Sequence, residues 1–111
     1  MIPPSSGASG VDNVTPKEAK ARQEAGAIIL DVRELDEWTG GHIAGAIHIP
    51  LGSIGSRLAE LDPARETIAV CHSGVRSTTA ARALLRSGFT QVKNLAGGMV
   101  AWAHDGLPVA K

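Results

Sequence analysis

The chain has 111 residues and a formal net charge of zero, with 43% hydrophobic and 20% charged residues. This balance is typical of one soluble globular domain, and the absence of a basic run argues against nucleic acid or an anionic membrane surface as the main partner. The single cysteine excludes an intrachain disulfide and a cysteine-rich zinc site. No stretch approaches the roughly 20 apolar residues of a membrane span, and the N-terminus lacks a signal-peptide pattern. We therefore expect a cytoplasmic protein, and a monomer by default.

The N-terminal residues differ in composition from the rest of the chain. Residues 1–10 are rich in proline, serine and glycine and contain almost no core-forming side chains. This composition predicts a flexible tail. Residues 11–111 are then a single domain, and residues 11–14 are its first candidate for a short edge strand.

A helix followed by a buried strand is predicted next. Thr15 can cap the helix and Glu18 completes a capping box, and the helix runs to about Ala25 before Gly26 ends it. The run over 27–32 is apolar without alternation. Such a run predicts a strand buried on both faces, which is typical of a central parallel strand.

The middle of the chain gives weaker signals. Residues 33–38 are charged and predict one or two helical turns, and residues 42–50 read as a loop that leads into a short strand closed by proline. Residues 53–61 predict a short helix, because three apolar side chains are spaced for one face: Ile54, Leu58 and Leu61.

The last third alternates strands and helices. Strands are predicted over 67–70 and 91–95, and a final helix follows Gly97-Gly98. The helix over 77–87 begins with three hydroxyl residues that can cap its exposed N–H groups: Ser77, Thr78 and Thr79. This alternation predicts an α/β fold with a mainly parallel sheet.

The loop that begins at Cys71 is the strongest candidate for a functional site. It follows a predicted strand and precedes a helix, and in open parallel sheets the site lies at the carboxyl ends of the strands. Gly74 lets the loop curl, so that successive N–H groups form a nest for an anion, while Arg76 adds positive charge. The nest and the helix N-terminus favour a thiolate. The residues expected to bind the substrate are His72, Ser73, Gly74, Val75, Arg76 and Ser77.

These features suggest sulfur, phosphoryl or arsenate chemistry and do not choose among them. The sequence, however, resembles the single-domain rhodanese (thiosulfate sulfurtransferase-like) family over nearly the whole chain beyond the tail. That resemblance implies the rhodanese fold, a central, mainly parallel five-stranded sheet flanked by helices. The motifs that carry it are Asp31-Val32-Arg33, Glu37-Trp38, residues 41–46 with Ile49-Pro50, residues 71–77, and residues 97–102.

The resemblance also implies a mechanism. Cys71 is the nucleophile, and its thiolate takes the outer sulfur of thiosulfate or a related persulfide donor. The loop N–H groups hold the resulting persulfide until cyanide, a thiol or a protein acceptor removes the sulfur. No cofactor is expected.

Two alternatives remain. Phosphatases and arsenate reductases of the same fold resemble Cys-x5-Arg, whereas only four residues separate Cys71 from Arg76 here, which favours sulfur over phosphate. The second alternative is a catalytically idle module that binds a partner. Idle modules typically lack the cysteine, whereas this chain keeps it with a complete loop.

Structural roles compete with functional ones at several loop positions. A lone cysteine is usually a buried, inert side chain, whereas a catalytic Cys71 is expected to be an exposed, activated thiol. We expect His72 to contribute mainly its backbone N–H. Arg76 either contacts the anionic donor or pairs with a carboxylate at the rim of the site.

Outside the loop, structural roles are favoured. Asp31 and Arg33 support the site rather than catalyse, and Arg33 is spaced to pair with Glu37. Trp38 and Trp102 are expected in the core, because aromatic residues are scarce and each buries a large area. A metal role is not expected for three histidines without ligand spacing: His42, His48 and His104.

Overall fold

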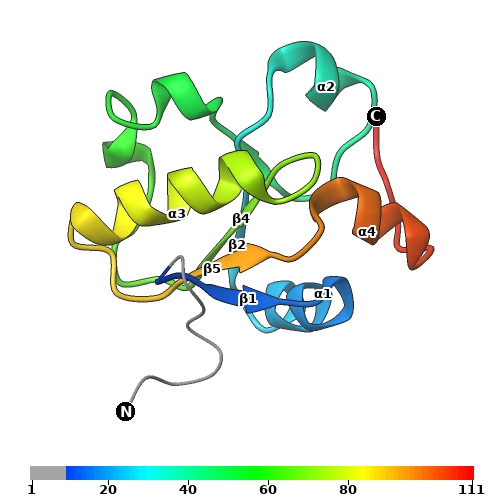
Figure 1. Ribbon diagram of the computed structural model, residues 1–111, viewed down its shortest axis with the longest axis horizontal. Coiled ribbons are helices and arrows are strands. Elements are labelled where there is room, and N and C mark those ends of the chain that lie inside the picture. The colour runs from blue at the N-terminus through cyan, green and yellow to red at the C-terminus, as the bar shows by residue number, and fades with distance from the viewer. Residues whose placement is uncertain (1–9) are drawn as a thin grey trace.

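The computed structural model describes residues 10–111, so the predicted tail lies outside the described residues except for Gly10. Five parallel strands form one sheet in the order β1-β5-β4-β2-β3 (Figure 1). Their bounds are Asp12–Val14 for β1, Ile28–Asp31 for β2, Ile47–His48 for β3, Thr67–Val70 for β4 and Val92–Leu95 for β5. The predicted five-stranded parallel α/β fold is confirmed.

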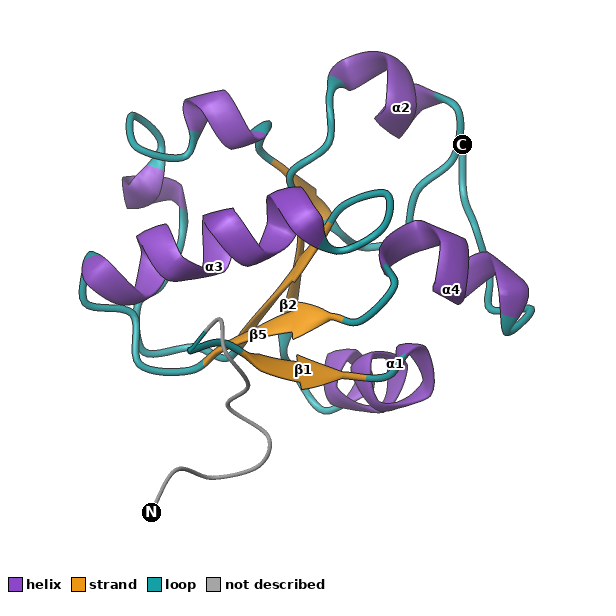
Figure 2. Ribbon diagram, viewed as in Figure 1, coloured by secondary structure: helices purple, strands orange, loops and turns teal. Residues whose placement is uncertain are grey.

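Helices cover both faces of this sheet (Figure 2). One face packs against α3 (Val75–Arg86), and the other packs against α1 (Pro16–Glu24) and α4 (Gly98–His104). The short helix α2 (Leu35–Thr39) follows β2. Within residues 10–111 no helix combines the length and apolar character needed to cross a membrane.

The two inner strands follow directly from their sequences. Every residue of β2 and of β4 is buried, as expected where helices cover both faces of a parallel sheet. The apolar core has one part on each side: Leu84 of α3 belongs to the first part, and Met99 and Trp102 of α4 belong to the second.

Helix α1 begins as predicted. The Thr15 hydroxyl accepts a bond from the Glu18 N–H at 3.1 Å, and the Glu18 carboxylate accepts one from the Thr15 N–H at 2.8 Å. The capping box is therefore complete. Gly26 follows the helix with φ +112°, a conformation that glycine adopts without strain.

Two predicted helices differ from the structure. The helix predicted over 53–61 is replaced by two 3-10 turns, Leu51–Ser53 and Leu58–Glu60, because Gly55 between them weakens a continuous helix. Helix α3 begins two residues earlier than predicted, and Gly74 is its cap. The prediction that Ser77, Thr78 and Thr79 cap α3 is wrong, because no side chain caps this helix. The Ser77 hydroxyl points to Cys71 and Asn94, and the Thr78 and Thr79 hydroxyls donate to backbone carbonyls one turn earlier.

The two tryptophans have different environments. Trp102 is in the core as predicted, and its indole N–H donates to the Pro108 carbonyl at 2.8 Å. The same prediction is wrong for Trp38, which is only half-buried. Its ring stacks against His42 at 3.6 Å between centroids and against His48 at 4.8 Å, so imidazoles rather than aliphatic side chains cover it.

Candidate active site

The topology brings the ends of β2 and β4 to one edge of the sheet. The two strands are parallel neighbours, and the N–H of Val32, just after β2, donates to the carbonyl of Val70, the last residue of β4. Cys71 follows Val70 directly, and α3 begins four residues later. The cysteine loop therefore lies at the carboxyl edge, where binding sites of parallel sheets are found.

Several donors of this loop converge on the sulfur of Cys71. The Gly74 N–H lies 3.1 Å from Sγ and the Ser77 hydroxyl oxygen lies 3.3 Å from it. The backbone N–H groups of Ser73 and Ser77 also act on the sulfur and lower its pKa. Gly74 has φ +109°, in the left-handed region, and this permits the tight curl.

This shell of donors favours the thiolate. Burial raises the pKa of the Cys71 thiol, but the hydrogen bonds from Ser77, Gly74 and Ser73 lower it by more. The pKa therefore lies below the ordinary value of a cysteine. The sulfur can thus carry negative charge without a neighbouring histidine as base.

The burial of Cys71 corrects an expectation. The sequence predicted an exposed, activated thiol, whereas the side chain is 0% exposed and packs into the core beneath α3. The loop curls over the sulfur, so the groups that activate Cys71 also cover it. Cys71 is therefore both buried and activated, a combination that neither sequence alternative described.

The N-terminus of α4 holds the loop from behind. The Met99 N–H donates to the Cys71 carbonyl at 2.8 Å, and the Val100 N–H donates to the His72 carbonyl at 3.1 Å. In a trans peptide the carbonyl and the N–H point in opposite directions. The bond to the His72 carbonyl therefore directs the N–H of the same peptide, which belongs to Ser73, toward the sulfur.

Gly98 makes this contact possible. It has φ +56°, and a Cβ at this position would lie 2.5 Å from the His72 carbonyl oxygen. No real Cβ atom tolerates that approach, so only glycine lets α4 reach the loop carbonyls. From the sequence we predicted only that a final helix follows Gly97-Gly98, and this role of Gly98 was not predicted.

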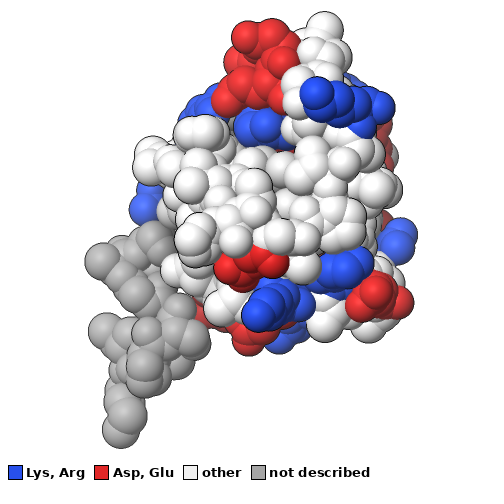
Figure 3. Space-filling model, turned by 90° about the vertical axis from the view of Figure 1, so that its right-hand side faces the viewer, with Lys and Arg blue, Asp and Glu red and all other residues white. Residues whose placement is uncertain are grey.

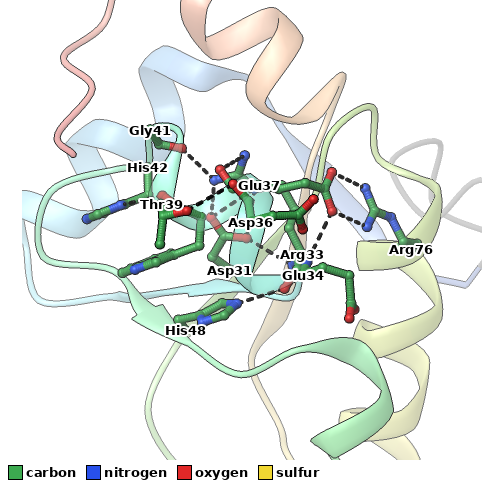
Figure 4. Close-up of polar contacts among 11 residues, drawn as sticks. Asp31, Arg33, Glu34, Asp36, Glu37, Thr39, Gly41, His42, His48 and Arg76 are labelled. Atoms are coloured by element: carbon green, nitrogen blue, oxygen red, sulfur yellow. Dashed lines mark hydrogen bonds and ion pairs between the residues drawn. The ribbon is translucent and has the colours of Figure 1, made fainter.

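Arg76 pairs with a carboxylate, which was one of its two predicted roles (Figure 4). Its guanidinium donates to the Glu37 carboxylate through two bonds of 2.7 and 2.8 Å. Hydrogen bonds from Arg76 lower the pKa of Glu37 to about 2, and the same pairing raises the pKa of Arg76. This pair joins α2 to the N-terminus of α3.

Arg33 pairs with Asp31, and the predicted pair with the Glu37 carboxylate is wrong. Arg33 Nη2 lies 2.7 Å from Asp31 Oδ2 and 2.8 Å from the Gly41 carbonyl, and Nη1 bonds to the Glu37 carbonyl (Figure 4). Asp31 and Arg33 are both buried. These contacts fix the segment around α2.

The remaining predicted loop residues lie at the surface. The side chains of His72 and Val75 are exposed, and the structure gives His72 a backbone role through its carbonyl. Within the part of the chain that the structure describes, no group of three acidic, histidine or cysteine side chains is arranged to hold a metal ion.

Besides Gly98, the sequence did not predict the roles of two further residues, Glu37 and Asn94. Glu37 was predicted to pair with Arg33, and its true partner Arg76 lies 39 positions along the chain. Asn94 was not considered, although a buried amide in the short strand β5 needs a polar partner. Its partners are Ser77 and Asn13, and its signal in the sequence is this unexplained polarity within β5.

Together the fold and the site define a parallel α/β domain with a cysteine at the carboxyl end of its central strand, whose sulfur accepts hydrogen bonds from the loop that follows it. The family model described as Rhodanese-like domain matches residues 15–105, and the chain belongs to this family.

Named relatives agree with this assignment. The chain is 35% identical over 91 residues to the thiosulfate sulfurtransferase GlpE of Stutzerimonas stutzeri, covering 82% of this chain and 84% of the relative. It is 47% identical over 74 residues to the putative sulfur carrier protein YrkF of Bacillus subtilis, covering 67% of this chain. The crystal structure of a thiosulfate sulfurtransferase from Pseudomonas aeruginosa superposes with a TM-score of 0.84 at 29% identity, covering 96% of this chain and 21% of that one.

The match to longer relatives concerns only part of their length. The chain spans 40% of YrkF and 44% of the transcriptional regulator Rv0324 of Mycobacterium tuberculosis. The rhodanese-like domain is thus shared between proteins of different size and name.

Replacing Gly98 tests the support from α4. We expect Gly98→Ala to lower the free energy of unfolding by about 1–3 kcal/mol and to raise the pKa of the Cys71 thiol, because the new Cβ pushes the loop carbonyls away. Urea unfolding and a pH titration of the thiol measure both effects. Gly55→Ala is the matched control, since a Cβ there meets nothing within 4 Å. Equal behaviour of the two variants would contradict the role of Gly98.

The Glu37–Arg76 pair predicts a pH dependence of stability. The pKa of Glu37 is lowered from 4.5 to about 2 on folding, so its contribution is complete above pH 4.5 and is lost as the pH falls toward 2. We expect Glu37→Gln to cost about 0.2–1 kcal/mol above this window, since the pair is partly exposed, and nothing below it. Urea unfolding across this pH range measures the difference, with the exposed Asp36→Asn on the same helix as control. A cost that is independent of pH would exclude the ion pair as its cause.

Proposed function

We propose that this protein is a sulfurtransferase that moves a sulfane sulfur from thiosulfate, or a related persulfide donor, to a thiophilic acceptor. The observation that carries this proposal is the convergence of the Ser73, Gly74 and Ser77 donors on the sulfur of Cys71. The loop is suited to a negative sulfur, and the relative GlpE is named a thiosulfate sulfurtransferase.

In the first step the Cys71 thiolate attacks the outer sulfur of thiosulfate. A new S–S bond forms, the bond to the sulfonate sulfur breaks, and sulfite leaves with its electron pair. Cys71 then carries a persulfide with the negative charge on its terminal sulfur. In the second step an acceptor such as cyanide or a thiolate attacks that terminal sulfur, and the Cys71 thiolate is regenerated. No external oxidant or reductant is needed in either step with cyanide, which leaves as thiocyanate.

The charge balance of the site supports a small anionic donor. Glu37 neutralises Arg76, so the fixed attraction comes from backbone and hydroxyl donors rather than from a free cation. Such donors stabilise a developing negative charge without reorganisation, as an oxyanion hole does.

The surface around the loop bears on the acceptor. Figure 3 shows the side of the molecule on which α4 lies and toward which the arrows of β1 and β5 point in Figure 1. A broad area of this side has no charged side chains, and charged residues lie around its border. Val75 and Val100 are exposed apolar side chains beside the loop. This surface supports a thiol or a protein as acceptor.

Intact mass tests the persulfide step. The purified protein is incubated with thiosulfate and freed of the excess, and its mass is compared with that of Cys71→Ser treated in the same way. We expect a gain of one sulfur atom in the wild type, reversed by cyanide with release of thiocyanate, and no gain in the variant. A folded protein with a titratable thiol that gains no sulfur from thiosulfate or from a persulfide donor would refute the proposal. Turnover of an aryl phosphate instead would indicate a phosphatase.

A further inference from the structure

A chain of hydrogen bonds leads from the sulfur of Cys71 through the protein to its surface. The Ser77 hydroxyl oxygen lies 3.3 Å from Cys71 Sγ and 2.5 Å from Asn94 Oδ1. Asn94 Nδ2 in turn donates to Asn13 Oδ1 at 2.9 Å. Ser77 is 0% and Asn94 4% exposed, whereas Asn13, on the edge strand β1, is exposed. Buried polar groups in this arrangement depend on one another for their partners.

The Ser77 hydroxyl cannot serve both of its neighbours at once. A hydroxyl carries one hydrogen, and the sulfur and Asn94 Oδ1 are both acceptors for it. When the hydrogen points to Asn94, a lone pair of Ser77 faces the sulfur, which suits a protonated thiol that donates its own hydrogen. A negative sulfur instead requires the hydroxyl hydrogen to point toward it.

The side-chain amide of Asn94 allows both arrangements. Rotation of an amide by 180° exchanges its oxygen for its nitrogen at almost the same positions. After rotation Asn94 Nδ2 donates to the Ser77 oxygen, and Ser77 is free to donate to the sulfur. The Asn94 oxygen then faces Asn13, whose own amide, being exposed, rotates to offer an N–H.

We propose that Asn94 is a positioning residue, which reverses its amide with the charge of Cys71 and so directs the Ser77 hydrogen toward the sulfur when the sulfur is negative. The thiolate and the persulfide of the proposed reaction are both negative. The inference rests on the proposed function where it concerns the persulfide. The direction of the Ser77 hydrogen itself depends only on the charge of the sulfur.

The charged groups near the loop are accounted for separately. The charge of Arg76 on α3 acts on Cys71, and Glu37 of α2 neutralises it. Asp31 and Arg33 at the end of β2 neutralise each other. No bond among these four side chains involves Ser77 or Asn94, so variants of Asn94 leave these pairs in place.

The test measures the rate of Cys71 alkylation by iodoacetamide against pH, because iodoacetamide reacts with the thiolate and needs no sulfur donor. Asn94→Asp places an acceptor-only group that retains the Ser77 hydrogen. We expect it to raise the midpoint of the profile by about one pH unit and to slow alkylation about tenfold at neutral pH. Asn94→Leu leaves the sulfur as the acceptor for Ser77, and we expect a change of less than about threefold.

A double variant separates the effect transmitted through the Ser77 hydroxyl from the effect of the negative charge that aspartate adds. In a Ser77→Ala background we expect Asn94→Asp to slow alkylation by less than about threefold, because only the charge remains. Lys93→Ala, next to Asn94 on β5 and paired with Asp12, is the control and should match the wild type. The proposal is overturned if Asn94→Asp has no effect, has the same effect with and without Ser77, or is matched by Asn94→Leu.

A variant at the exposed Asn13 tests the same proposal without a change at the buried Asn94, where a substitution can prevent folding. Asn13→Asp also presents only acceptors, so it keeps the nitrogen of Asn94 turned toward itself and the oxygen turned toward Ser77. We expect a rise in the midpoint in the same direction as for Asn94→Asp, abolished in the Ser77→Ala background, and an unchanged midpoint would overturn the proposal. If these shifts are seen but the protein transfers no sulfur, the proposed function is refuted, whereas the positioning role of Asn94 stands.

Discussion

The bond between the His72 carbonyl and the N–H of Val100 sets the direction of the peptide that faces Cys71. Its length is 3.1 Å, and it lies beside the 2.8 Å bond from Met99 to the Cys71 carbonyl. Because a peptide is planar and trans, the bond from α4 to the His72 carbonyl makes the Ser73 N–H of the same peptide point the opposite way, away from α4. The Ser73 N–H is therefore oriented by α4, and the close approach of that helix requires Gly98.

The parallel sheet supplies the remaining geometry. β4 is the central strand, so Cys71 emerges between neighbours on both sides. β2 brings the buried pair of Asp31 and Arg33 to the same edge, and this pair anchors the segment around α2. Helix α2 then presents Glu37 to Arg76. The loop is thus fastened by α4 behind it and by α2 at the start of α3, while its sulfur lies against the core.

Much of the fold was predictable because local signals agreed with the tertiary structure. Three local signals specify geometry that the fold uses: the capping box of α1, the apolar runs of β2 and β4, and Gly74 before α3. The prediction of a helix over 53–61 was wrong because it relied on the spacing of the apolar side chains and gave too little weight to the low helix propensity of Gly55. At the site, the sequence predicted the cysteine loop and its donors. The partners Glu37, Asn94 and Gly98 depend on contacts between distant segments, which spacing along the chain does not reveal.

The central claim is that the loop stabilises negative charge on a buried sulfur. The most direct measurement is the pH titration of the Cys71 thiolate by its ultraviolet absorbance in the wild-type protein, which contains a single cysteine. The account predicts a midpoint below that of the same thiol in the urea-unfolded protein, since the donors of Ser73, Gly74 and Ser77 outweigh burial. A midpoint at or above that value in the folded protein would show that burial dominates, and it would contradict the account.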